Sequence, residues 1–378
     1  MVTIQSQNFG VEIEMTGVSR GTAASVIANY FGVGGIHFAG GTYQTYEAKD
    51  SKGRVWKCMR DGSITPRRRR GGAIVEADDT YRCEVVTPIL QYEDITDLQE
   101  VIRALVKKGA MANSSCGIHV HVDGANHTPE SLYRLLNFAT GRQDLFYEAL
   151  QIGNRADHWC HKINPALFRE MKKNGRASRN DAERIWYSVV NDGYDGGVDS
   201  SHYNSTRYHG INLHAFFTKG TVEFRLFNGT THAGRIKAYV QFCLAMSAWA
   251  INCDHDNLHF KSVAGYTQQQ KHDLMLRVLT KRLGMRGPEF KTARLPMCAL
   301  SAATIMAIWI WFGCPMNWTG CTKRLLLTGS ATTAIWKLTT ANMTAQGRSS
   351  RAGISCSGGR ATGLHITRLA EMFKEKVQ

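Results

Sequence analysis

The sequence predicts an α+β protein built on one sheet, with helices packed against one side of it. Four short segments alternate strictly between apolar and polar residues, the pattern of a strand with one buried face. Longer runs between them carry apolar residues at helical spacing. The second face of each strand presents acidic, imidazole or guanidinium groups, which predicts one sheet face lined with ligands for cations and phosphates. The four segments are FGVEIEM (9–15), YRCEVVTPIL (81–90), CGIHVHVD (116–123) and TVEFRLFNGT (221–230).

The last of these segments shows the pattern most fully. One face consists of Val222, Phe224 and Leu226, and the other of Thr221, Glu223, Arg225 and Phe227. Alternation in the other three strands places on the polar face Glu12, Glu14, Glu84, His119 and His121. Four glutamates on one face would repel one another and raise each other's pKa unless cations neutralise them. Two Mg²⁺ ions would balance the four charges, and Mg²⁺ prefers such oxygen ligands.

Caps and turns predict the elements before the second of these strands. A helix is expected after a cap at Ser19 or Thr22, and it ends at Gly32. Two strand-like runs flank Asp50–Gly53, which predicts a hairpin. The run Arg67–Arg70 precedes two glycines and is predicted to be a solvated loop. It lacks the interleaved aromatic residues that single-strand nucleic-acid binders use for stacking.

Helices are expected on both sides of the His119 strand. Ile95–Lys108 has an amphipathic pattern that stops at Gly109. Thr128 followed by Pro129 is a strong helix start, because proline suits the first helical position. A mixed helical region is expected from there to about Val190.

The next segment is predicted to hold a loop, a strand and a long helix. Asp192–Ser205 is rich in Gly, Asp and Ser and is long enough to form a lid. Arg207–Phe217 is expected to be a strand with Asn212 and His214 on one face. His232–Ile251 is expected to be an apolar helix.

The residues after Phe290 differ in composition, which predicts two regions, 8–290 and 291–378. No acidic residue occurs from Lys291 to Ala370, and Leu295–Thr322 carries no charge. The tail holds eleven basic and two acidic residues, so +9 of the formal net charge of +15 lies there. Four interpretations stay open: an unstructured tail, a small added helical element, a membrane segment, or a non-native end produced by a reading-frame change.

Composition and motifs exclude several classes of protein. The ten cysteines form no CxxC pair and no dense spacing, so reduced thiols are expected and a tetrahedral zinc site is not. No signal peptide opens the chain, and a cytoplasmic protein is expected. GxxxxGK[ST], HExxH and GxGxxG after a strand are all absent from the sequence, so any use of ATP would not involve a P-loop.

The order of the motifs resembles the amidoligase family found in phage and bacterial genomes. The motifs are FGVEIEM, DGSI (61–64), CEVVTPIL, CGIHVHVD, RYHGINLHAF (207–216) and TVEFRLFNGTTHAGRIKAYVQ (221–241). This family belongs to the carboxylate-amine ligase superfamily with glutamine synthetase and glutamate-cysteine ligase. The resemblance covers about residues 8–290 and leaves the tail without a counterpart.

The resemblance implies a glutamine synthetase-like catalytic fold, an antiparallel half-barrel sheet backed by helices. It implies a ligase that uses ATP and Mg²⁺ to join a carboxylate to an amine through an acyl phosphate. The expected partners are a peptide or amino-acid carboxylate and an amine acceptor, in the cytoplasm, or that of the host if a phage encodes the protein. Neither nucleic acid nor membrane is an expected partner.

The resemblance also assigns roles to individual residues. It implies metal ligation by Glu12, Glu14, Glu84, Glu223 and His119. It implies catalytic roles for Arg225, His119, His121 and Arg207. It implies nucleotide contacts by Arg225, Asn212 and Asp61, since a guanidinium offers a phosphate a fixed fork of donors. Two other functions stay open: a basic protein that binds nucleic acid or envelope, and a metal-dependent hydrolase that needs no ATP.

Overall fold

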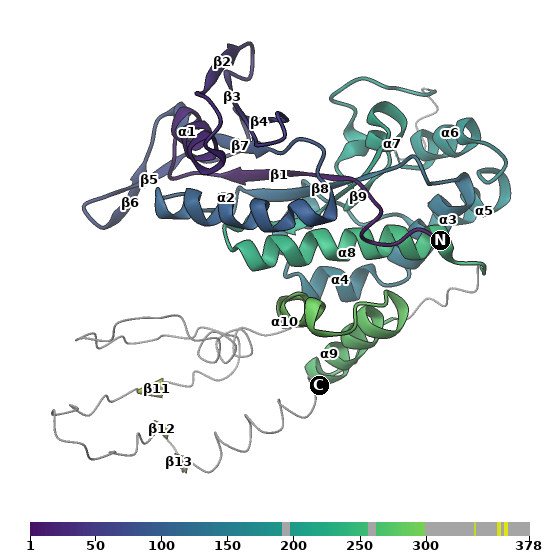
Figure 1. Ribbon diagram of the computed structural model, residues 1–378. Coiled ribbons are helices and arrows are strands. Elements are labelled where there is room, and N and C mark those ends of the chain that lie inside the picture. The colour runs from purple at the N-terminus through teal and green to yellow at the C-terminus, as the bar shows by residue number, and fades with distance from the viewer. Residues whose placement is uncertain (191–196, 256–261, 299–335, 338–353, 357–358, 362–378) are drawn as a thin grey trace. The chain divides into compact units, whose positions relative to one another are not determined.

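The computed structural model describes residues 1–190, 197–255, 262–298, 336–337, 354–356 and 359–361 (Figure 1). The chain divides into two compact units, residues 1–306 and 307–378. In the second unit the described residues form a small antiparallel sheet of β11 (Trp336–Lys337), β12 (Ile354–Cys356) and β13 (Gly359–Ala361). All strands and helices discussed below belong to the first unit.

The first unit is built on an antiparallel sheet of eight strands. Their order is β2-β3-β4-β7-β1-β8-β10-β9. The bounds are β1 (Phe9–Met15), β2 (His37–Gly40), β3 (Thr45–Lys49), β4 (Val55–Met59), β7 (Cys83–Val86), β8 (Gly117–Asp123), β9 (Ile211–Asn212) and β10 (Thr221–Asn228). The predicted α+β class, with a large antiparallel sheet, is confirmed. The predicted hairpin around Asp50–Gly53 is confirmed as the turn between β3 and β4.

Helices cover the apolar face of this sheet. Figure 1 shows α2 (Ile95–Lys107) and α8 (Ala233–Asn252) along one side of the sheet. Val11 and Ile13 of β1 are buried in the core. Ser19 caps α1 (Arg20–Phe31) by accepting a hydrogen bond from the Thr22 amide, as the sequence predicts. The other helices are α3 (Pro129–Thr140), α4 (Gln143–Ala149), α5 (Pro165–Asn174), α6 (Arg179–Val190), α7 (His214–Lys219), α9 (Gln268–Arg277) and α10 (Lys291–Cys298).

Short helical turns complete the unit. Five are of the 3₁₀ type and one is a π-helical turn, and several of them link the longer elements. They are η1 (Asp79–Tyr81), η2 (Tyr92–Asp94), η3 (Gly153–Asp157), η4 (Ser205–Arg207), the π-helical η5 (Val278–Arg282) and η6 (Pro288–Phe290). The predicted mixed helical region before Val190 is therefore confirmed.

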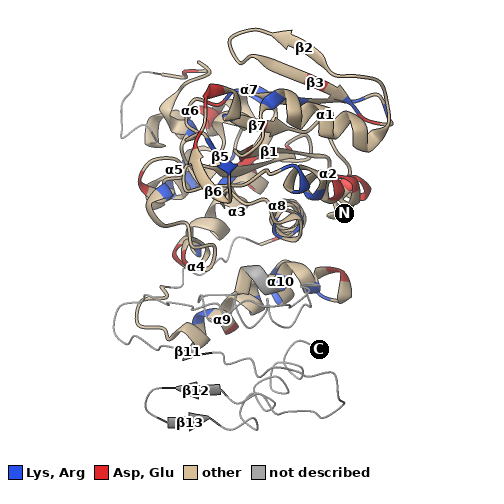
Figure 2. Cartoon of the chain, turned by 90° about the vertical axis from the view of Figure 1, so that its left-hand side faces the viewer, with Lys and Arg blue, Asp and Glu red and all other residues tan. Residues whose placement is uncertain are grey.

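The arginine run is a strand, so the prediction of a loop is wrong. Arg67–Arg70 forms β5 and pairs with β6 (Ala73–Glu76). Gly71 and Gly72 both have positive φ, which suits the two-residue turn of a hairpin. Thr16 fixes the base of the hairpin by accepting a hydrogen bond from the Arg67 amide at 2.7 Å. Figure 2 shows the basic positions along β5.

The predicted strand at Arg207–Phe217 is also largely wrong. Within residues 207–217 only β9 (Ile211–Asn212) is a strand, and it pairs with β10 through Asn212 opposite Glu223 and Ile211 opposite Phe224. The chain then turns into α7, which ends at Gly220 in the left-handed conformation. His214 therefore starts a helix instead of continuing the face that carries Asn212. Its Nδ1 lies 2.6 Å from the Tyr187 hydroxyl, so a tertiary contact accompanies the early end of the strand.

A bulge in β10 corrects the predicted position of Phe227. Phe224 lies opposite Val120, but Phe227 lies opposite Ile118, so β10 uses one extra residue over this stretch. Phe227 is thereby moved to the helix side, where its ring stacks on Tyr239 of α8 with centroids 4.1 Å apart. The prediction that Phe227 shares a face with Glu223 is wrong.

The end of the first unit reaches into the segment predicted to be a separate tail. α10 packs on α8 and buries Ala293 and Met297. In the described part of the chain, no helix combines the length and the apolar composition that a membrane crossing requires. Most of the apolar run Leu295–Thr322 lies outside the described residues, as do residues 192–196 of the predicted lid. The interpretations offered for the tail stay predictions.

Candidate active site

The register of the sheet gathers the polar side chains of four strands. β1 lies between β7 and β8, and β10 pairs with the far edge of β8. Residues directly opposite each other in antiparallel strands point to the same face. This face is the one opposite the helices α2 and α8. The opposed pairs are Glu14 with Glu84, Glu12 with His119, Glu223 with His121, and Asn212 with Glu223.

Glu12 is held between two imidazoles. Its Oε2 lies 2.9 Å from His119 Nδ1 and its Oε1 lies 3.1 Å from His121 Nε2. Burial raises the pKa of Glu12, but the charges and hydrogen bonds of the two histidines outweigh burial and leave that pKa well below its usual range. Burial also lowers the pKa of His121, yet Glu12 and Glu223 together raise it above its ordinary value. Thr221 Oγ1, 2.9 Å from His121 Nδ1, fixes the ring orientation.

The Glu223 carboxylate is also compensated by neighbouring polar and charged side chains. Arg225 Nη1 donates to its Oε1 at 2.6 Å, and Asn212 Nδ2 donates to its Oε2 at 2.7 Å. Burial raises the pKa of Glu223, but Arg225 and then His121 lower it to about 2. Arg225 is only 5 % exposed, and Glu223 outweighs its burial and raises its pKa further. Among the described residues, Arg225 Nε has no hydrogen-bond partner.

Glu84, in contrast, has acidic neighbours. It is 9 % exposed, and a ligand oxygen on each of Glu84, Glu14 and Asp61 falls within 4.8 Å of the others. Burial, followed by the charges of Glu12, Glu14 and Asp61, raises the pKa of Glu84 well above its ordinary value. Within the described part of the chain, no basic side chain forms an ion pair with Glu84. This carboxylate is therefore the least compensated charge of the site.

The environment of Glu14 is intermediate between those of Glu12 and Glu84. Its Oε2 accepts a hydrogen bond from the Gly117 amide at 2.6 Å, and its Oε1 lies 3.7 Å from His119 Nε2. Burial raises the pKa of Glu14, although His119 opposes the rise. A Cβ at Gly117 would lie 2.5 Å from Arg155 Nη2, so glycine allows that buried guanidinium to approach the strand. Arg155 also lowers the Glu14 pKa, after burial and His119.

The cluster as a whole carries more negative than positive charge. Glu12, Glu84 and His119 place ligand atoms within 4.8 Å of one another, as do Glu12, His121 and Glu223. With Glu14, Glu84 and Asp61 they form three overlapping groups of potential ligands. Five carboxylates face Arg225, Arg155 and two imidazoles, so ionised carboxylates leave a net negative charge even if both imidazoles are protonated. Such a site is suited to cations with oxygen ligands.

A protein-family model described as "Putative amidoligase enzyme" matches residues 5–247. The chain belongs to this amidoligase family. The match confirms the resemblance, supports an enzyme of the ligase type, and covers all four strands of the cluster. No curated protein matches the chain.

The amidoligase brings together nine of the ten residues expected at its site. The pairs and groups above join the five carboxylates with His119, His121, Arg225 and Asn212. Arg207 is the exception, because it lines an adjoining pocket and donates to the His202 carbonyl oxygen at 3.0 Å. The roles assigned to these residues stay predictions, since their positions do not by themselves show what they bind.

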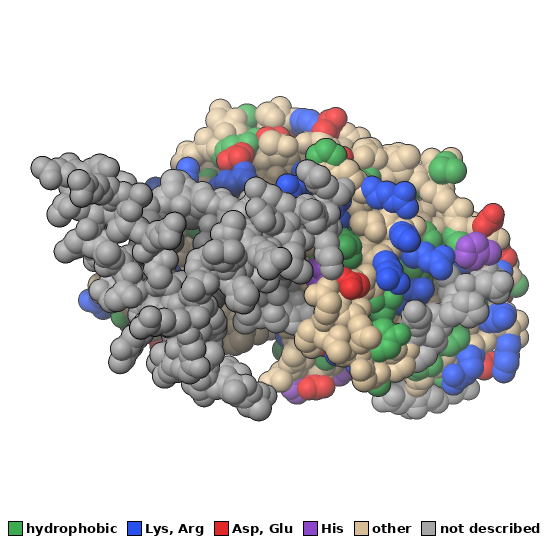
Figure 3. Space-filling view, turned by 90° about the horizontal axis from the view of Figure 1, so that it is seen from below, with side chains coloured by type: hydrophobic (Ala, Val, Ile, Leu, Met, Phe, Trp, Pro, Cys, Tyr) green, Lys and Arg blue, Asp and Glu red, His purple; other side chains and the backbone are tan. Residues whose placement is uncertain are grey.

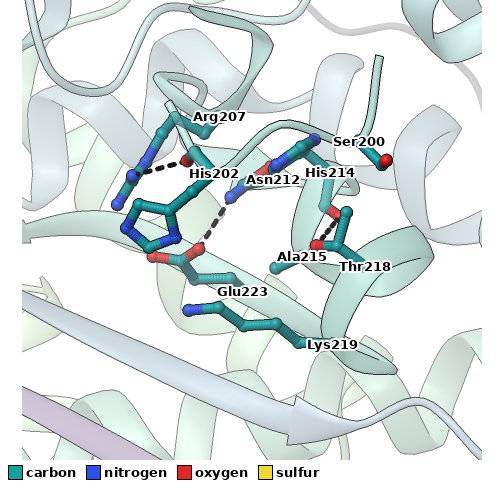
Figure 4. Close-up of a pocket in the computed structure, with 9 residues that line it drawn as sticks. All are labelled: Ser200, His202, Arg207, Asn212, His214, Ala215, Thr218, Lys219 and Glu223. Carbon is teal, nitrogen blue, oxygen red and sulfur yellow. Dashed lines mark hydrogen bonds between the residues drawn. The ribbon is translucent and has the colours of Figure 1, made fainter. Parts of the chain in front are cut away.

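The adjoining pocket has a volume of about 240 Å³. Figure 4 shows that residues of the loop before β9, of α7 and of β10 surround it, and that Asn212 donates to Glu223 at its wall. Its lining residues are Ser200, His202, Arg207, Asn212, His214, Ala215, Thr218, Lys219 and Glu223. Glu223 and Asn212 thus belong to both the cluster and the pocket.

Four basic residues of this site were not predicted from the sequence: His202, His214, Lys219 and Arg155. His202 lies in the segment predicted to be a lid, and Lys219 ends α7, where a basic residue is ordinarily solvated. His214 was noticed, but on a strand. Arg155 lies in η3 far from any motif, and only its approach to Gly117 connects it with the cluster. None of them carries a spacing signal that could have identified it.

Proposed function

We propose that this amidoligase uses ATP and Mg²⁺ to join a carboxylate to an amine through an acyl phosphate. The observation that carries the proposal is Glu84, a buried carboxylate whose pKa is raised by burial and by the charges of Glu12, Glu14 and Asp61. Burying several like charges together is costly unless a cation compensates them. The proposed substrates are amino acids or peptides, and the proposed location is the cytoplasm.

The residues fit magnesium by the chemistry of their donor atoms. Each of the three overlapping groups contains two or three carboxylates, and no cysteine belongs to any of them. Hard oxygen donors favour Mg²⁺ over softer metals. We infer that Glu12, Glu14, Glu84, Glu223 and Asp61 hold the ions, with His119 and His121 orienting Glu12. Bound Mg²⁺ would supply electrostatic stabilisation for phosphoryl transfer.

Arg225 supports a role in phosphate binding. It is buried and permanently charged, and its planar group has donors beyond the one given to Glu223. Glu223 and the ring of Tyr208, 5.9 Å from the guanidinium carbon, fix its position. A preorganised guanidinium of this kind stabilises negative charge without reorganising during the reaction. In this proposal Arg225 orients the transferred phosphate.

One contact supports the half-barrel of glutamine synthetase-like enzymes. The Tyr43 hydroxyl, between β2 and β3, lies 2.9 Å from the Tyr203 hydroxyl, in the loop before β9. β2 and β9 are the two edge strands of the sheet. A contact between segments that adjoin opposite edges supports a sheet that curves around one face. We propose that this curvature forms a half-barrel around the cluster.

Turnover assays on purified protein test the proposed function. ATP should be consumed only when Mg²⁺, a carboxylate and an amine are all present, and EDTA should abolish the reaction. Hydrolysis of an amide or ester by the metal-loaded protein without ATP would support the rival hydrolase and contradict our proposal. ATP consumption that continues without any amine would contradict the ligase step.

The part of the surface visible in Figure 3 does not add support to the nucleic-acid alternative. On the face shown in Figure 3, basic side chains lie in several groups with acidic, apolar and uncharged side chains between them. Nucleic-acid binders instead use a continuous basic groove or stripe. A titration with single-stranded and double-stranded oligonucleotides at about 0.15 M salt should give no saturable binding.

A further inference from the structure

The pocket beside Glu223 differs in charge from the cluster. Two cationic side chains, Lys219 and Arg207, line it, and neither forms an ion pair with any described residue. Burial, then Arg207 and Lys219, lower the pKa of His202, and burial and Arg207 lower that of His214. The charges of Lys219 and Arg207 therefore affect other side chains that line the pocket. The walls formed by Lys219 and Arg207 attract anions, whereas Glu223 and the cluster beyond it attract cations.

The two cations come from separate elements. Lys219 ends α7, and Arg207 ends η4 in the segment that leads to β9. Figure 4 shows their side chains on either side of His202, with the Glu223 carboxylate beside the His202 ring. Ser200 and Thr218 add hydroxyl groups to the lining. A ligand in this pocket would have positive groups at two walls and a carboxylate at another.

The size of the pocket limits the ligand. Its volume of about 240 Å³ is below the roughly 300–1,000 Å³ of sites that enclose drug-sized molecules. This volume suits an amino acid better than a whole nucleotide. The mixed charge of the lining also matters, because a simple dianion would meet Glu223 and the acidic cluster behind it. A zwitterion instead matches the pocket, with its carboxylate toward Lys219 and Arg207 and its amine toward Glu223.

We propose that this pocket binds the amine substrate, and that this substrate is an amino acid whose own carboxylate pairs with Lys219 and Arg207. The inference rests on the proposed ligase function, and it adds the class of the amine. The paired carboxylate is not the one that reacts. Its binding directs the amine toward the cluster, where the other substrate's carboxylate is activated.

Binding measurements test the inference without requiring turnover. The full-length protein is titrated with a panel of amino acids in the presence of Mg²⁺, and each amino acid that binds is compared with its carboxamide. Loss of one charge-assisted hydrogen bond or ion pair should weaken binding of the carboxamide about tenfold or more. Lys219→Gln should weaken binding of the free amino acid about tenfold and leave the carboxamide within about twofold.

A control variant and a second ligand class make the test specific. Lys108→Gln removes an exposed lysine just after α2, and it should bind both forms as the wild type does. Equal affinity for acid and amide, equal losses of both in Lys219→Gln, or no binding from the panel would overturn the inference. So would Lys219-dependent binding of succinate or glutarate as tight as that of the amino acids, because it would assign the pocket to the other substrate.

A measurement of ATP binding separates failure of the proposed ligase function from failure of the inference about the amine. ATP binding is measured separately on the wild type and on Lys219→Gln, and both should bind Mg²⁺ and ATP equally. A protein that binds amino acids through Lys219 but does not bind ATP would contradict the ligase proposal and leave the amino-acid site standing. A protein that binds ATP and Mg²⁺ but fails the carboxamide comparison would contradict only the inference about the amine.

Discussion

The two ends of the cluster differ in how far neighbouring side chains compensate the charge of its buried carboxylates. At the matched end, Glu12 and Glu223 contact His119, His121 and Arg225, and both carboxyl pKa values are lowered. At the acidic end, formed by Glu14, Glu84 and Asp61, the pKa values of Glu14 and Glu84 are raised. The two ends share β1, whose Glu12 and Glu14 are two residues apart.

The difference shows at which end of the site the protein's own side chains compensate the carboxylates without a bound cation. The matched end is held in one geometry by direct contacts of 2.6–3.1 Å. The acidic end holds three carboxylates, and among the described side chains only His119 forms an ion pair with one of them, Glu14. We expect mutations at the matched end to damage the protein without ligand, and mutations at the acidic end to affect mainly the binding of cations. Four experiments test this difference, in order of decreasing expected effect.

The largest effect is expected for Arg225→Gln in metal-free buffer. The change leaves Glu223 buried without its main cationic partner, which typically costs about 3–5 kcal/mol of unfolding free energy. Because the folded-state pKa of Glu223 is lowered to about 2, the stability it contributes is present above the ordinary glutamate value of 4.5 and is lost as pH falls toward 2. Urea unfolding at pH 7 and pH 3 should show the larger loss at pH 7.

Arg225→Lys separates charge from geometry at the same position. The lysine keeps the positive charge beside Glu223 but loses the planar fork, so we expect a modest change in stability. ATP turnover should fall about 10²–10³-fold, the loss typical for removing one preorganised donor. Near-normal turnover by this variant would remove Arg225 from the phosphate site and leave it a structural partner of Glu223.

Glu12→Gln and Glu14→Gln test the metal site on the strand shared by both ends. Each change removes one negative charge at nearly constant shape, so Mg²⁺ and ATP should bind more weakly. At 100 times its Kd, a ligand stabilises the folded state by about 2.7 kcal/mol, and each variant should lose much of that gain. Melting curves with and without Mg²⁺ and ATP give the comparison. Equal ligand-induced shifts in all three proteins would mean that β1 binds no cation.

Glu84→Gln should give the smallest change in the stability of the metal-free protein, and this change should be a gain and not a loss. Without metal, the neutral side chain relieves repulsion and should stabilise the protein by on the order of 1 kcal/mol at pH 7. Since the folded-state pKa of Glu84 is raised, wild type and variant should be equally stable below pH 4.5 and diverge as the pH rises. Saturating Mg²⁺ should reverse the order. Asp97→Asn, a change in α2 away from the cluster that keeps an oxygen acceptor for the Tyr30 hydroxyl, serves as the control.

Strict alternation was sufficient to predict the polar face. Val11, Ile13 and the residues between them have the period of a strand, and a strand with one buried face must turn Glu12 and Glu14 to the other side. Local chemistry also determined the helix starts, as the Ser19 and Thr128 caps show. The family match then confirmed a resemblance that rested on the order of these motifs.

Local sequence patterns gave wrong predictions where contacts with a neighbouring element determined the conformation. The bulge in β10 moves Phe227 onto Tyr239, and α7 begins at His214 where the sequence favoured a longer strand. Glu12 and Glu14 look equivalent in sequence, yet one meets two imidazoles and the other lies among carboxylates and a backbone amide. Register and strand order decide that difference, because a side chain's charge environment depends on residues that are distant in the chain. Lys219 belongs to the pocket for the same reason.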